Sequence, residues 1–170
     1  MRRFRGLCSG MRSVRMRSAI LVSMLLVVAS PLIGQTTTLT LAGNTITFPA
    51  PTATDYTNGW VNSTTGVTFT VDATSSGGGS NTTTIQIRST SANLGGGKLL
   101  ADLQWRRSDL ATWNSITIGD VNVEARSQTF NGANDPWSNT IFFRMLLSWT
   151  TDAPATYSAN YRITLRVTQP

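Results

Sequence analysis

The sequence predicts an all-β protein, an antiparallel sandwich of two sheets of immunoglobulin-like or jelly-roll type, preceded by an N-terminal signal helix. After residue 35, apolar side chains alternate with Thr, Ser and Asn at the two-residue period of a β-strand, and no window shows helical periodicity. Clusters of Gly, Pro and Asn separate these runs at the spacing of turns. Thr is abundant throughout, and its branched side chain favours a pleated, half-buried surface. A closed barrel has the same periodicity and remains the alternative.

Residues 1–34 have the three parts of a secretory signal peptide. Six of the 14 Lys and Arg residues lie in the first 17 positions, and an apolar run of 11 residues, 19–29, follows before small residues that end at Gly34. A helix that spans a bilayer needs about 20 apolar residues, so this run is too short to remain as an anchor. We therefore expect cleavage after Gly34, one β-sandwich domain over residues 35–170, and secretion to the periplasm, the cell surface or the medium, with no membrane span after cleavage.

Removal of the signal peptide changes which functions the composition allows. All 8 acidic residues follow position 35 and balance the 8 basic residues that remain, which argues against nucleic acid as a partner. The chain has no His, and its one cysteine, Cys8, lies within the signal peptide. The mature domain therefore lacks the commonest acid–base group and the best nucleophile of enzymes. We expect no enzymatic activity, no catalytic residue and no cofactor.

The first predicted element is a hairpin that joins residues 38–41 to 45–48 around Gly43, because a short Gly-containing link separates two alternating runs. Trp105 and Trp149 share strand faces with aliphatic residues, so both are expected in the core. The chain offers eight to ten strands in this way, which suits two packed sheets. The further predicted strands cover residues 67–71, 85–88, 99–106, 115–125 with a break at Gly119-Asp120, 141–149 and 157–168.

Two weaker hypotheses concern the acidic residues. Asp120 and Glu124 are spaced to share one face of a strand, and a pair of carboxylates can hydrolyse a glycosidic bond. The turn over residues 131–135, with Asn131 and Asp135 at its ends, offers oxygen ligands of the kind that Ca²⁺ prefers. This turn carries a single carboxylate and the carboxylates show no recognisable spacing. We therefore assign no metal ligand and leave a weak calcium site at this turn open.

The C-terminal third carries a family resemblance. Pro154 and Tyr157 form a Pro-x-x-Tyr element that enters a final strand with apolar residues at every second position from Ala159 to Val167. In this respect residues 141–170 resemble the end of secreted bacterial β-sandwich proteins of the spore coat protein U and pilin-like group. The resemblance implies a signal peptide, a sandwich fold and a structural role in a surface layer or fibre, without catalytic residues. The cysteines of that group are absent here, so assembly by a chaperone is not implied.

These observations predict a secreted, non-enzymatic structural subunit of the cell surface or extracellular space. It would be pilin-like or coat-like and associate with itself or with other surface proteins by strand pairing. The alternating segment at the start of the mature chain is the candidate edge for this association, and pairing of that segment within its own chain is equally open. The candidate edge residues are Thr36, Thr38, Leu39 and Leu41.

The alternative function is a carbohydrate-binding module, with a polysaccharide as the partner. Trp and Tyr can stack on sugar rings because each combines a broad apolar face with a polar edge. In a sandwich they can instead plug the ends of the core, and exposure of two or more of them on one face would favour the sugar. The candidate stacking residues, which lie in or beside predicted loops, are Tyr56, Trp60, Trp113 and Trp137.

Overall fold

A computed structural model describes residues 36–74, 80–129, 131, 133–152 and 157–168. The predicted signal peptide, residues 1–34, lies outside these residues, as does Pro154 of the Pro-x-x-Tyr element. Among the described residues, no helix combines the length and the apolar character that crossing a membrane requires.

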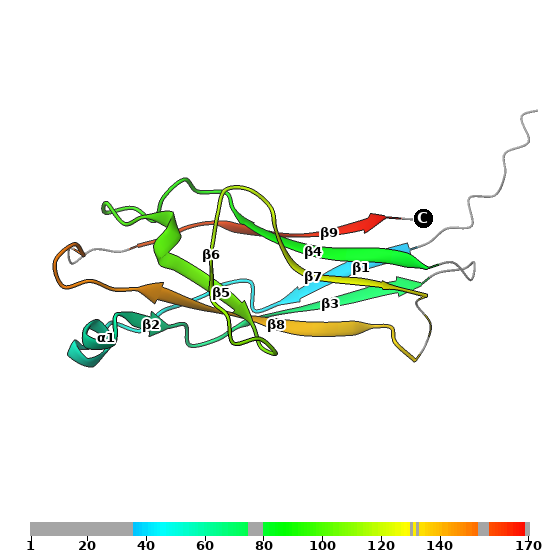
Figure 1. The fold of residues 1–170 in the computed structure, drawn as a ribbon, viewed down its shortest axis with the longest axis horizontal. Helices are drawn as coiled ribbons and strands as arrows, with labels where there is room; N and C mark the ends of the chain where they lie inside the picture. The colour runs from blue at the N-terminus through cyan, green and yellow to red at the C-terminus, as the bar shows by residue number, and fades with distance from the viewer. Residues whose placement is uncertain (1–35, 75–79, 130, 132, 153–156, 169–170) are drawn as a thin grey trace, which may run out of the picture. The chain divides into compact units, whose positions relative to one another are not determined.

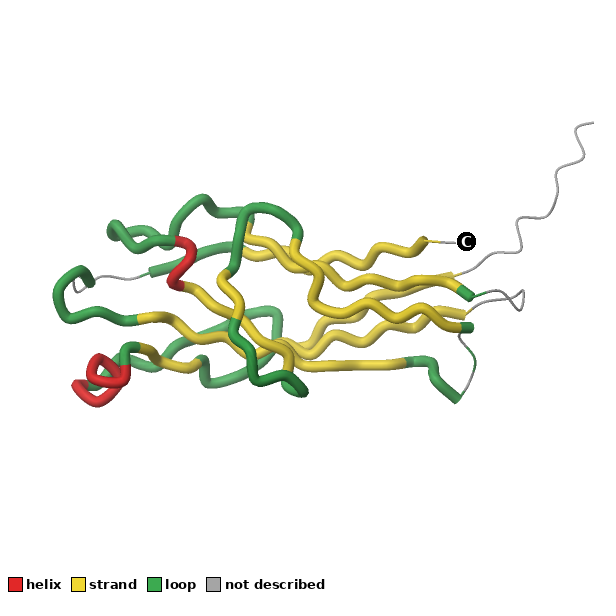
Figure 2. Tube along the Cα trace, in the orientation of Figure 1, coloured by secondary structure: helices red, strands yellow, loops and turns green. Residues whose placement is uncertain are grey.

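Two antiparallel sheets pack as a sandwich, which confirms the predicted fold class (Figures 1 and 2). The larger sheet has the strand order β1-β3-β8-β5-β6, with β2 paired to the last residues of β8. The smaller sheet has the order β7-β4-β9. The elements are β1 (Thr36–Ala42), α1 (Ala53–Asn58), β2 (Trp60–Asn62), β3 (Val67–Thr74), β4 (Asn81–Ser89), η1 (Leu100–Asp102), β5 (Leu103–Arg107), β6 (Asn114–Ser115), β7 (Val121–Gln128), β8 (Trp137–Leu146) and β9 (Tyr161–Thr168).

The short helix α1 interrupts the strands at a place where we predicted a loop. The Thr52 hydroxyl accepts a hydrogen bond from the N–H of Asp55 at 3.2 Å, and the Asp55 carboxylate accepts one from the N–H of Thr52 at 2.8 Å. This reciprocal pair is a capping box, which satisfies backbone donors that the first turn of a helix leaves free. Gly59 ends the helix with a φ of +82°, a left-handed conformation that glycine adopts without strain. The chain then enters β2 at Trp60.

The core lies between the two sheets and follows the period-two pattern. In β3 the side chains of Val67, Phe69 and Val71 are each 0% exposed, and the threonines between them face outward. Trp105 of β5 is 3% exposed, which confirms its predicted place in the core. Enclosing one large apolar side chain of this kind stabilises the fold by about 1.5–3 kcal/mol. The other buried apolar side chains are Val61, Ala73, Ile85, Ile87, Leu94, Leu103, Ile116, Val123, Trp137, Ile141, Phe143, Met145 and Ile163.

The hairpin predicted around Gly43 is wrong, because β1 pairs antiparallel with β3 and residues 45–48 form no strand. Pairing with β3, which lies further along the chain, places apolar side chains opposite each other, as with Leu41 and Phe69, and so extends the core. Gly43 has a φ of +76°, and a Cβ there would lie 2.7 Å from the carbonyl oxygen of Gly66, so this turn requires glycine. Beyond the turn the chain leaves the sheet.

Trp149 is exposed, so its predicted place in the core is wrong. β8 ends at Leu146, and the N–H of Ser148 donates to Oδ2 of Asp152 at 2.9 Å, which closes a turn. Trp149 lies in this turn and is 63% exposed. The final strand is also shorter than predicted and begins at Tyr161. In both places the alternation of side chains continues in the sequence beyond the point where the ladder of hydrogen bonds ends.

The predicted break at Gly119-Asp120 separates β6 from β7, and these two strands belong to different sheets. The pairing of β7 with β4 is irregular, with a register shift between Ile85 and Gln86. Beside it the successive residues Val123 and Glu124 of β7 are both buried, at 6% and 9% exposure. A carboxylate thereby reaches the region between the sheets, where it needs polar partners.

Candidate functional site

Two edge strands border one side of the sandwich. Among the described residues β1 pairs only with β3 and β9 pairs only with β4, so each strand has one edge without a ladder partner. β1 and β9 approach each other along this side although they belong to different sheets. An edge of this kind presents unpaired N–H and C=O groups that can accept another strand. The predicted association residues Thr36, Thr38, Leu39 and Leu41 all lie on β1.

The apolar side chains beside these two edges are only partly covered. Along β9 the exposed fraction rises from 8% at Ile163 to 38% at Val167, with Leu165 partly buried between them. On β1 the side chains of Leu39 and Leu41 pack against the same core and are also only half-buried. We call this strip, formed by the core-facing side chains of β1 and β9, the seam. A strand placed along it would complete the burial of these side chains.

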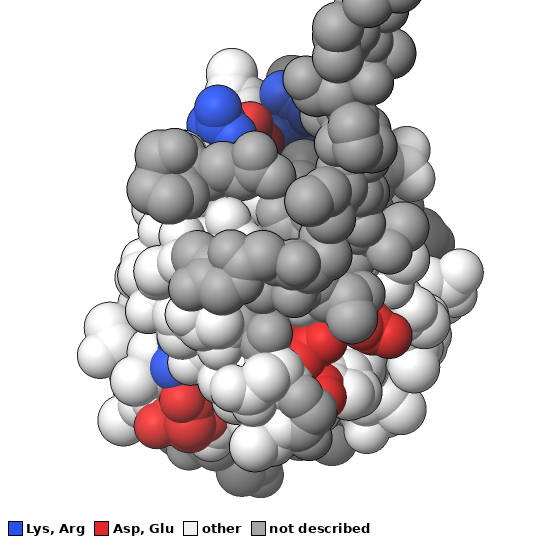
Figure 3. All heavy atoms as spheres, turned by 90° about the vertical axis from the view of Figure 1, so that its right-hand side faces the viewer, with Lys and Arg blue, Asp and Glu red and all other residues white. Residues whose placement is uncertain are grey.

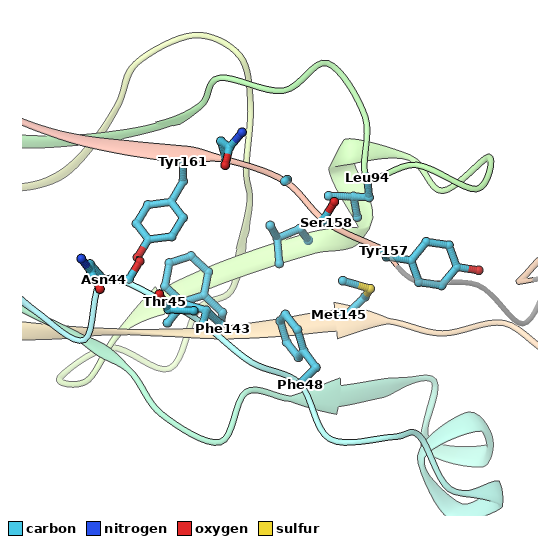
Figure 4. A pocket seen from close by; sticks show the side chains of 13 residues that line it. Asn44, Thr45, Phe48, Leu94, Phe143, Met145, Tyr157, Ser158 and Tyr161 are labelled. Atoms are coloured by element: carbon cyan, nitrogen blue, oxygen red, sulfur yellow. The ribbon is translucent and has the colours of Figure 1, made fainter.

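Where β1 ends and β9 begins, a cleft of about 300 Å³ opens between the sheets (Figure 4). One wall is the segment 44–48 that follows β1, and the other is the segment 157–161 that leads into β9. Phe143 and Met145 of β8 line the cleft between these walls. Apolar and polar groups share the lining, because Asn44, Thr45 and Ser158 line the cleft beside the apolar side chains of β8.

Tyr161 joins the two walls of this cleft. Its hydroxyl donates a hydrogen bond of 2.7 Å to the backbone carbonyl of Asn44, and its ring lies 5.6 Å from that of Phe143. Burial raises the pKa of Tyr161, so the hydroxyl keeps its proton to higher pH than a free tyrosine.

A network of charged side chains closes the opposite side of the sandwich. Arg107 of β5 pairs with Asp109 and lies 3.6 Å from Glu124 of β7. Glu124 also pairs with Arg126 at 2.8 Å and accepts a hydrogen bond from the Asn139 amide at 3.2 Å. The hydrogen bond from Arg107 lowers the pKa of Asp109 to about 2. Since β5 and β7 belong to different sheets, the network holds the sheets together here and leaves the seam as the open side.

The carboxylates considered for hydrolysis or for calcium have local partners. Asp120 lies 3.7 Å from Arg88, and Oδ1 of Asp135 accepts a hydrogen bond from the N–H of Ala73 at 2.8 Å. Burial, reinforced by the nearby Asp72, raises the pKa of Asp135. In the part of the chain that the structure describes, no three His, Cys, Asp or Glu side chains gather where they could hold a metal ion.

The outer face of the larger sheet carries a second candidate site, two arginines among three aromatic rings. The centre of the Trp113 ring lies 4.5 Å from the Cζ atom of Arg144 and 5.1 Å from that of Arg106. Trp60 of β2 stands 5.9 Å from Arg144 by the same measure. Phe142 stands 5.6 Å from Arg106, which faces it across the β5–β8 pairing. We call these five side chains the arginine–aromatic face.

The two arginines of this face lack acidic partners. Every Asp and Glu of the chain lies among the described residues. None of the ion pairs formed by these residues involves Arg106 or Arg144. Arg144 donates from Nε to the Gln104 amide oxygen at 2.7 Å, and Arg106 donates from an Nη to the Leu110 carbonyl at 2.8 Å. Burial, followed by the charge of Arg106, lowers the pKa of Arg144.

The four predicted stacking residues lie in three different environments. Trp60 and Trp113, both half-buried, meet beside Arg144 on the arginine–aromatic face. Tyr56 of α1 stacks on Trp149, with ring centres 4.4 Å apart and an angle of 28° between the planes. Trp137 is 5% exposed and belongs to the core, which removes it from the candidates. The exposed Trp149 and the two arginines were not candidates from the sequence.

Comparison of the chain with protein-family models, with curated proteins and with solved structures found no match. The functional assignment therefore depends on the geometry of the seam and of the arginine–aromatic face.

Proposed function

We propose that the protein is a secreted, non-enzymatic structural subunit of the cell surface or extracellular space that associates with copies of itself by strand pairing. The observation that carries this proposal is the seam, where two edge strands border apolar side chains that are only half covered. The resemblance of residues 141–170 to spore coat protein U and pilin-like proteins points to the same role.

Strand addition at the seam would be favourable for two reasons. An incoming strand gains main-chain hydrogen bonds along an unpaired edge, and these bonds supply affinity whatever the sequence of that strand. Its side chains also cover Leu165 and Val167, and each square ångström of apolar surface removed from water contributes about 25 cal/mol. Both β1 and β9 offer such an edge, so each copy has two places at which pairing can begin.

A second copy of the chain is compatible in charge. After residue 35 the 8 acidic and 8 basic residues balance, so no net charge drives the copies apart. At the end of the sandwich shown in Figure 3, much of the described surface is uncharged, and the charged side chains form a few small groups, two of which contain both signs of charge. Arg162 and Arg166 of β9 are exposed on the outer side of the strand, which leaves the core-facing side of the seam apolar.

The positions of the acidic groups support a non-enzymatic role. Glu124, Asp152 and Asp120 each lie within 3.7 Å of a basic side chain. The pair of Glu124 with Arg107 links β7 to β5 of the other sheet, and the pair of Asp152 with Lys98 holds the turn after β8. With no His in the chain, acid–base chemistry would fall mainly to carboxylates, of which these are three out of eight. Their pairing within the fold supports a role in the stability of the sandwich.

The proposal is tested by the variant Val167→Lys, which puts a charge into the seam at a position already 38% exposed. The chain is exported with its own leader, purified in processed form and studied by sedimentation velocity. Wild-type protein should form oligomers, and the variant should stay monomeric with unchanged thermal unfolding. Leu110→Lys, at a position 46% exposed in a loop outside the seam, is the matched control and should associate normally. A monomeric wild type, or a variant that associates as the wild type does, would overturn the proposal.

The second candidate function is polysaccharide binding. The observation that favours it is the position of Trp60 and Trp113, which are both half-exposed beside the guanidinium of Arg144. Tyr56 and the exposed Trp149 provide a further pair of rings beside the start of β2. Aromatic rings that combine an apolar face with a polar edge are suited to sugars. The two functions are compatible, because the seam and the arginine–aromatic face are different surfaces.

A further inference from the structure

We propose that the arginine–aromatic face binds an acidic polysaccharide, whose anionic groups are held by Arg106 and Arg144. The inference rests on the second candidate function and adds to it the charge of the ligand. The observation behind it is a pair of half-buried guanidinium groups that share one aromatic ring, Trp113, and have no carboxylate beside them.

Two neighbouring arginines of β5 differ in whether their charge is balanced by a carboxylate of the chain. Arg107 pairs with Asp109 and lies within 3.6 Å of Glu124, so its charge is balanced inside the fold. Arg106, one residue earlier, faces the opposite side of the sheet and contacts the rings of Trp113 and Phe142. A half-buried positive charge without a counter-ion is costly, and an external anion would offset that cost.

The free donors of these arginines are placed for such an anion. A guanidinium that stacks on an aromatic ring keeps its N–H edge in the plane of the group, away from the ring. Within the described residues no hydrogen bond engages the two Nη groups of Arg144, whose Nε is bound to Gln104. On Arg106, one Nη is bound to the Leu110 carbonyl and the Nε is buried, so within the described residues the second Nη is the donor left for an external anion. A carboxylate or sulfate can accept two such N–H groups side by side.

The aromatic rings narrow the class of anion. Trp60 and Phe142, the latter 36% exposed, flank the two arginines on the same outer face. A polysaccharide with a carboxylate or sulfate on its repeats offers anionic groups together with apolar ring faces. A nucleic acid would call for a larger excess of basic residues than a chain whose 8 acidic and 8 basic residues balance after position 35. A neutral polysaccharide would leave both guanidinium groups unpaired.

The arrangement also predicts how binding depends on salt. Arg106 and Arg144 stand around one ring and repel each other, and an anion between them removes this repulsion. Because both side chains remain in contact with solvent, dissolved ions screen the attraction. Affinity for an acidic polymer should therefore fall as the salt concentration rises.

The test measures binding of the exported, processed protein to three polymers by affinity electrophoresis and calorimetry. The polymers are polygalacturonate, which is carboxylated, dextran sulfate, which is sulfated, and unmodified dextran, which is neutral. We expect at least one acidic polymer to bind more than about tenfold more tightly than dextran at low salt, and to lose that advantage at about 0.5 M salt. The two acidic polymers distinguish a carboxylate from a sulfate as the preferred anion.

Variants then locate the site. The double variant Arg106→Gln/Arg144→Gln should weaken binding of the acidic polymer by about tenfold or more, because it removes the forked donors and keeps side chains of similar length. The matched control, Arg162→Gln/Arg166→Gln, removes the same charge from the exposed side of β9 and should change affinity less than about twofold. Thermal unfolding of each variant checks that the fold is intact, and Arg144→Lys, which keeps the charge, should bind with intermediate affinity.

The outcomes distinguish failure of the acidic ligand from failure of polysaccharide binding as a whole. If dextran binds as tightly as the acidic polymers, the preference for an acidic ligand is excluded and polysaccharide binding itself stands. If the double arginine variant keeps wild-type affinity for the acidic polymer, Arg106 and Arg144 do not hold the anion and the proposed site is wrong. If none of the three polymers binds, both the inference and the second candidate function fail. If the β9 control loses as much affinity as the double arginine variant, binding is a general charge effect and the assigned face is wrong.

Discussion

The hydroxyl of Tyr161 donates a hydrogen bond of 2.7 Å to the backbone carbonyl of Asn44, which lies 117 positions earlier in the chain. This bond joins the segment that leaves β1 to the first residue of β9, where the cleft meets the seam. It crosses between the two sheets on the side where their edges are unpaired. Tyr161 therefore contributes to keeping the open side of the sandwich at a fixed width.

Tyr161→Phe should lower the free energy of unfolding by about 1 kcal/mol, the usual contribution of one such hydrogen bond. The ring contact with Phe143 is kept in this variant, so the loss reports on the hydroxyl alone. Chemical denaturation at pH 7 measures it. Tyr56→Phe, which keeps the stacked pair with Trp149, is the matched control and should change stability less. Equal effects of the two substitutions would contradict the bridging role.

The stabilisation by the Tyr161 hydroxyl should depend on pH in the alkaline range, and the same variant measures this dependence. Burial raises the pKa of Tyr161 in the folded state above its unfolded value near 10.0. A raised pKa means that the stabilisation is complete below pH 10 and is lost as the pH rises through the folded-state value. The difference in stability between wild type and Tyr161→Phe should therefore be constant from pH 7 to about pH 9 and shrink above pH 10. A difference that grows at high pH would have the wrong sign.

Lys98 and Asp152 form a buried ion pair with 3% and 5% side-chain exposure, and Nζ lies 2.7 Å from both carboxylate oxygens. The pair fixes the turn after β8 to the segment that precedes η1. Lys98→Met should destabilise the fold by about 3 kcal/mol, since it leaves a buried carboxylate without its counter-ion. Adding Asp152→Asn, which removes that charge, should recover part of the loss. Equilibrium unfolding of the two variants checks this, and additive losses would contradict it.

The period-two pattern predicted β3, β4, β8 and β9 because each of these strands turns one face to the opposite sheet. For the same reason the predicted burial of Trp105 is confirmed. What the pattern does not contain is which strands pair. The Gly43 turn is a local signal for a hairpin, whereas the observed partner of Leu41 is Phe69, and only the assembled core favours that pairing.

For the candidate sites too, the sequence indicates single residues and the fold decides which of them come together. Trp60 and Trp113 were recognisable as loop aromatics, but their meeting beside Arg144 depends on β2 and β5 both pairing with β8. Arg106 and Arg144 could not be recognised as a site from the sequence, because the absence of a nearby carboxylate is a property of the fold. Trp149 was misplaced because the turn that ends β8 is closed by a carboxylate further along the chain.

Acid should weaken the charged network on the closed side of the sandwich. The hydrogen bond from Arg107 lowers the pKa of Asp109 from 3.8 to about 2, with a smaller contribution from Asn139. A lowered pKa means that the stabilisation is present above pH 3.8 and is lost as the pH falls towards 2. Asp109→Asn should lower Tm at pH 7 by about 1–3 °C, a small effect because the carboxylate is half-exposed and screened.

The comparison of wild type and Asp109→Asn across the acid range is the measurement for this prediction. Their Tm values should converge between pH 4 and pH 2, where wild-type Asp109 takes up its proton. Parallel curves over this range would show that the pairing with Arg107 does not depend on the charge of Asp109.

Asp72 and Asp135 are two acidic groups near each other at the end of β3. Unlike Asp109, whose pKa is lowered, Asp135 has a raised pKa. Burial, opposed by the hydrogen bond from the Ala73 N–H and reinforced by the charge of Asp72, raises the pKa of Asp135 above 3.8. A raised carboxyl pKa means that the folded state is penalised once the pH exceeds the unfolded value, since the carboxylates then repel. Asp72→Asn should therefore raise Tm at pH 7 by about 1–2 °C, a modest gain because Asp72 is exposed.

The gain from Asp72→Asn should vanish below about pH 3, where Asp135 is protonated in the folded and unfolded states alike. Differential scanning calorimetry at pH 7 and pH 3 measures both values. Addition of millimolar CaCl₂ at pH 7 extends the experiment to the turn over residues 131–135, because an ion that binds the two carboxylates would stabilise wild type more than the variant. A destabilised variant at pH 7 would mean that Asp72 contributes a favourable contact that outweighs its repulsion of Asp135.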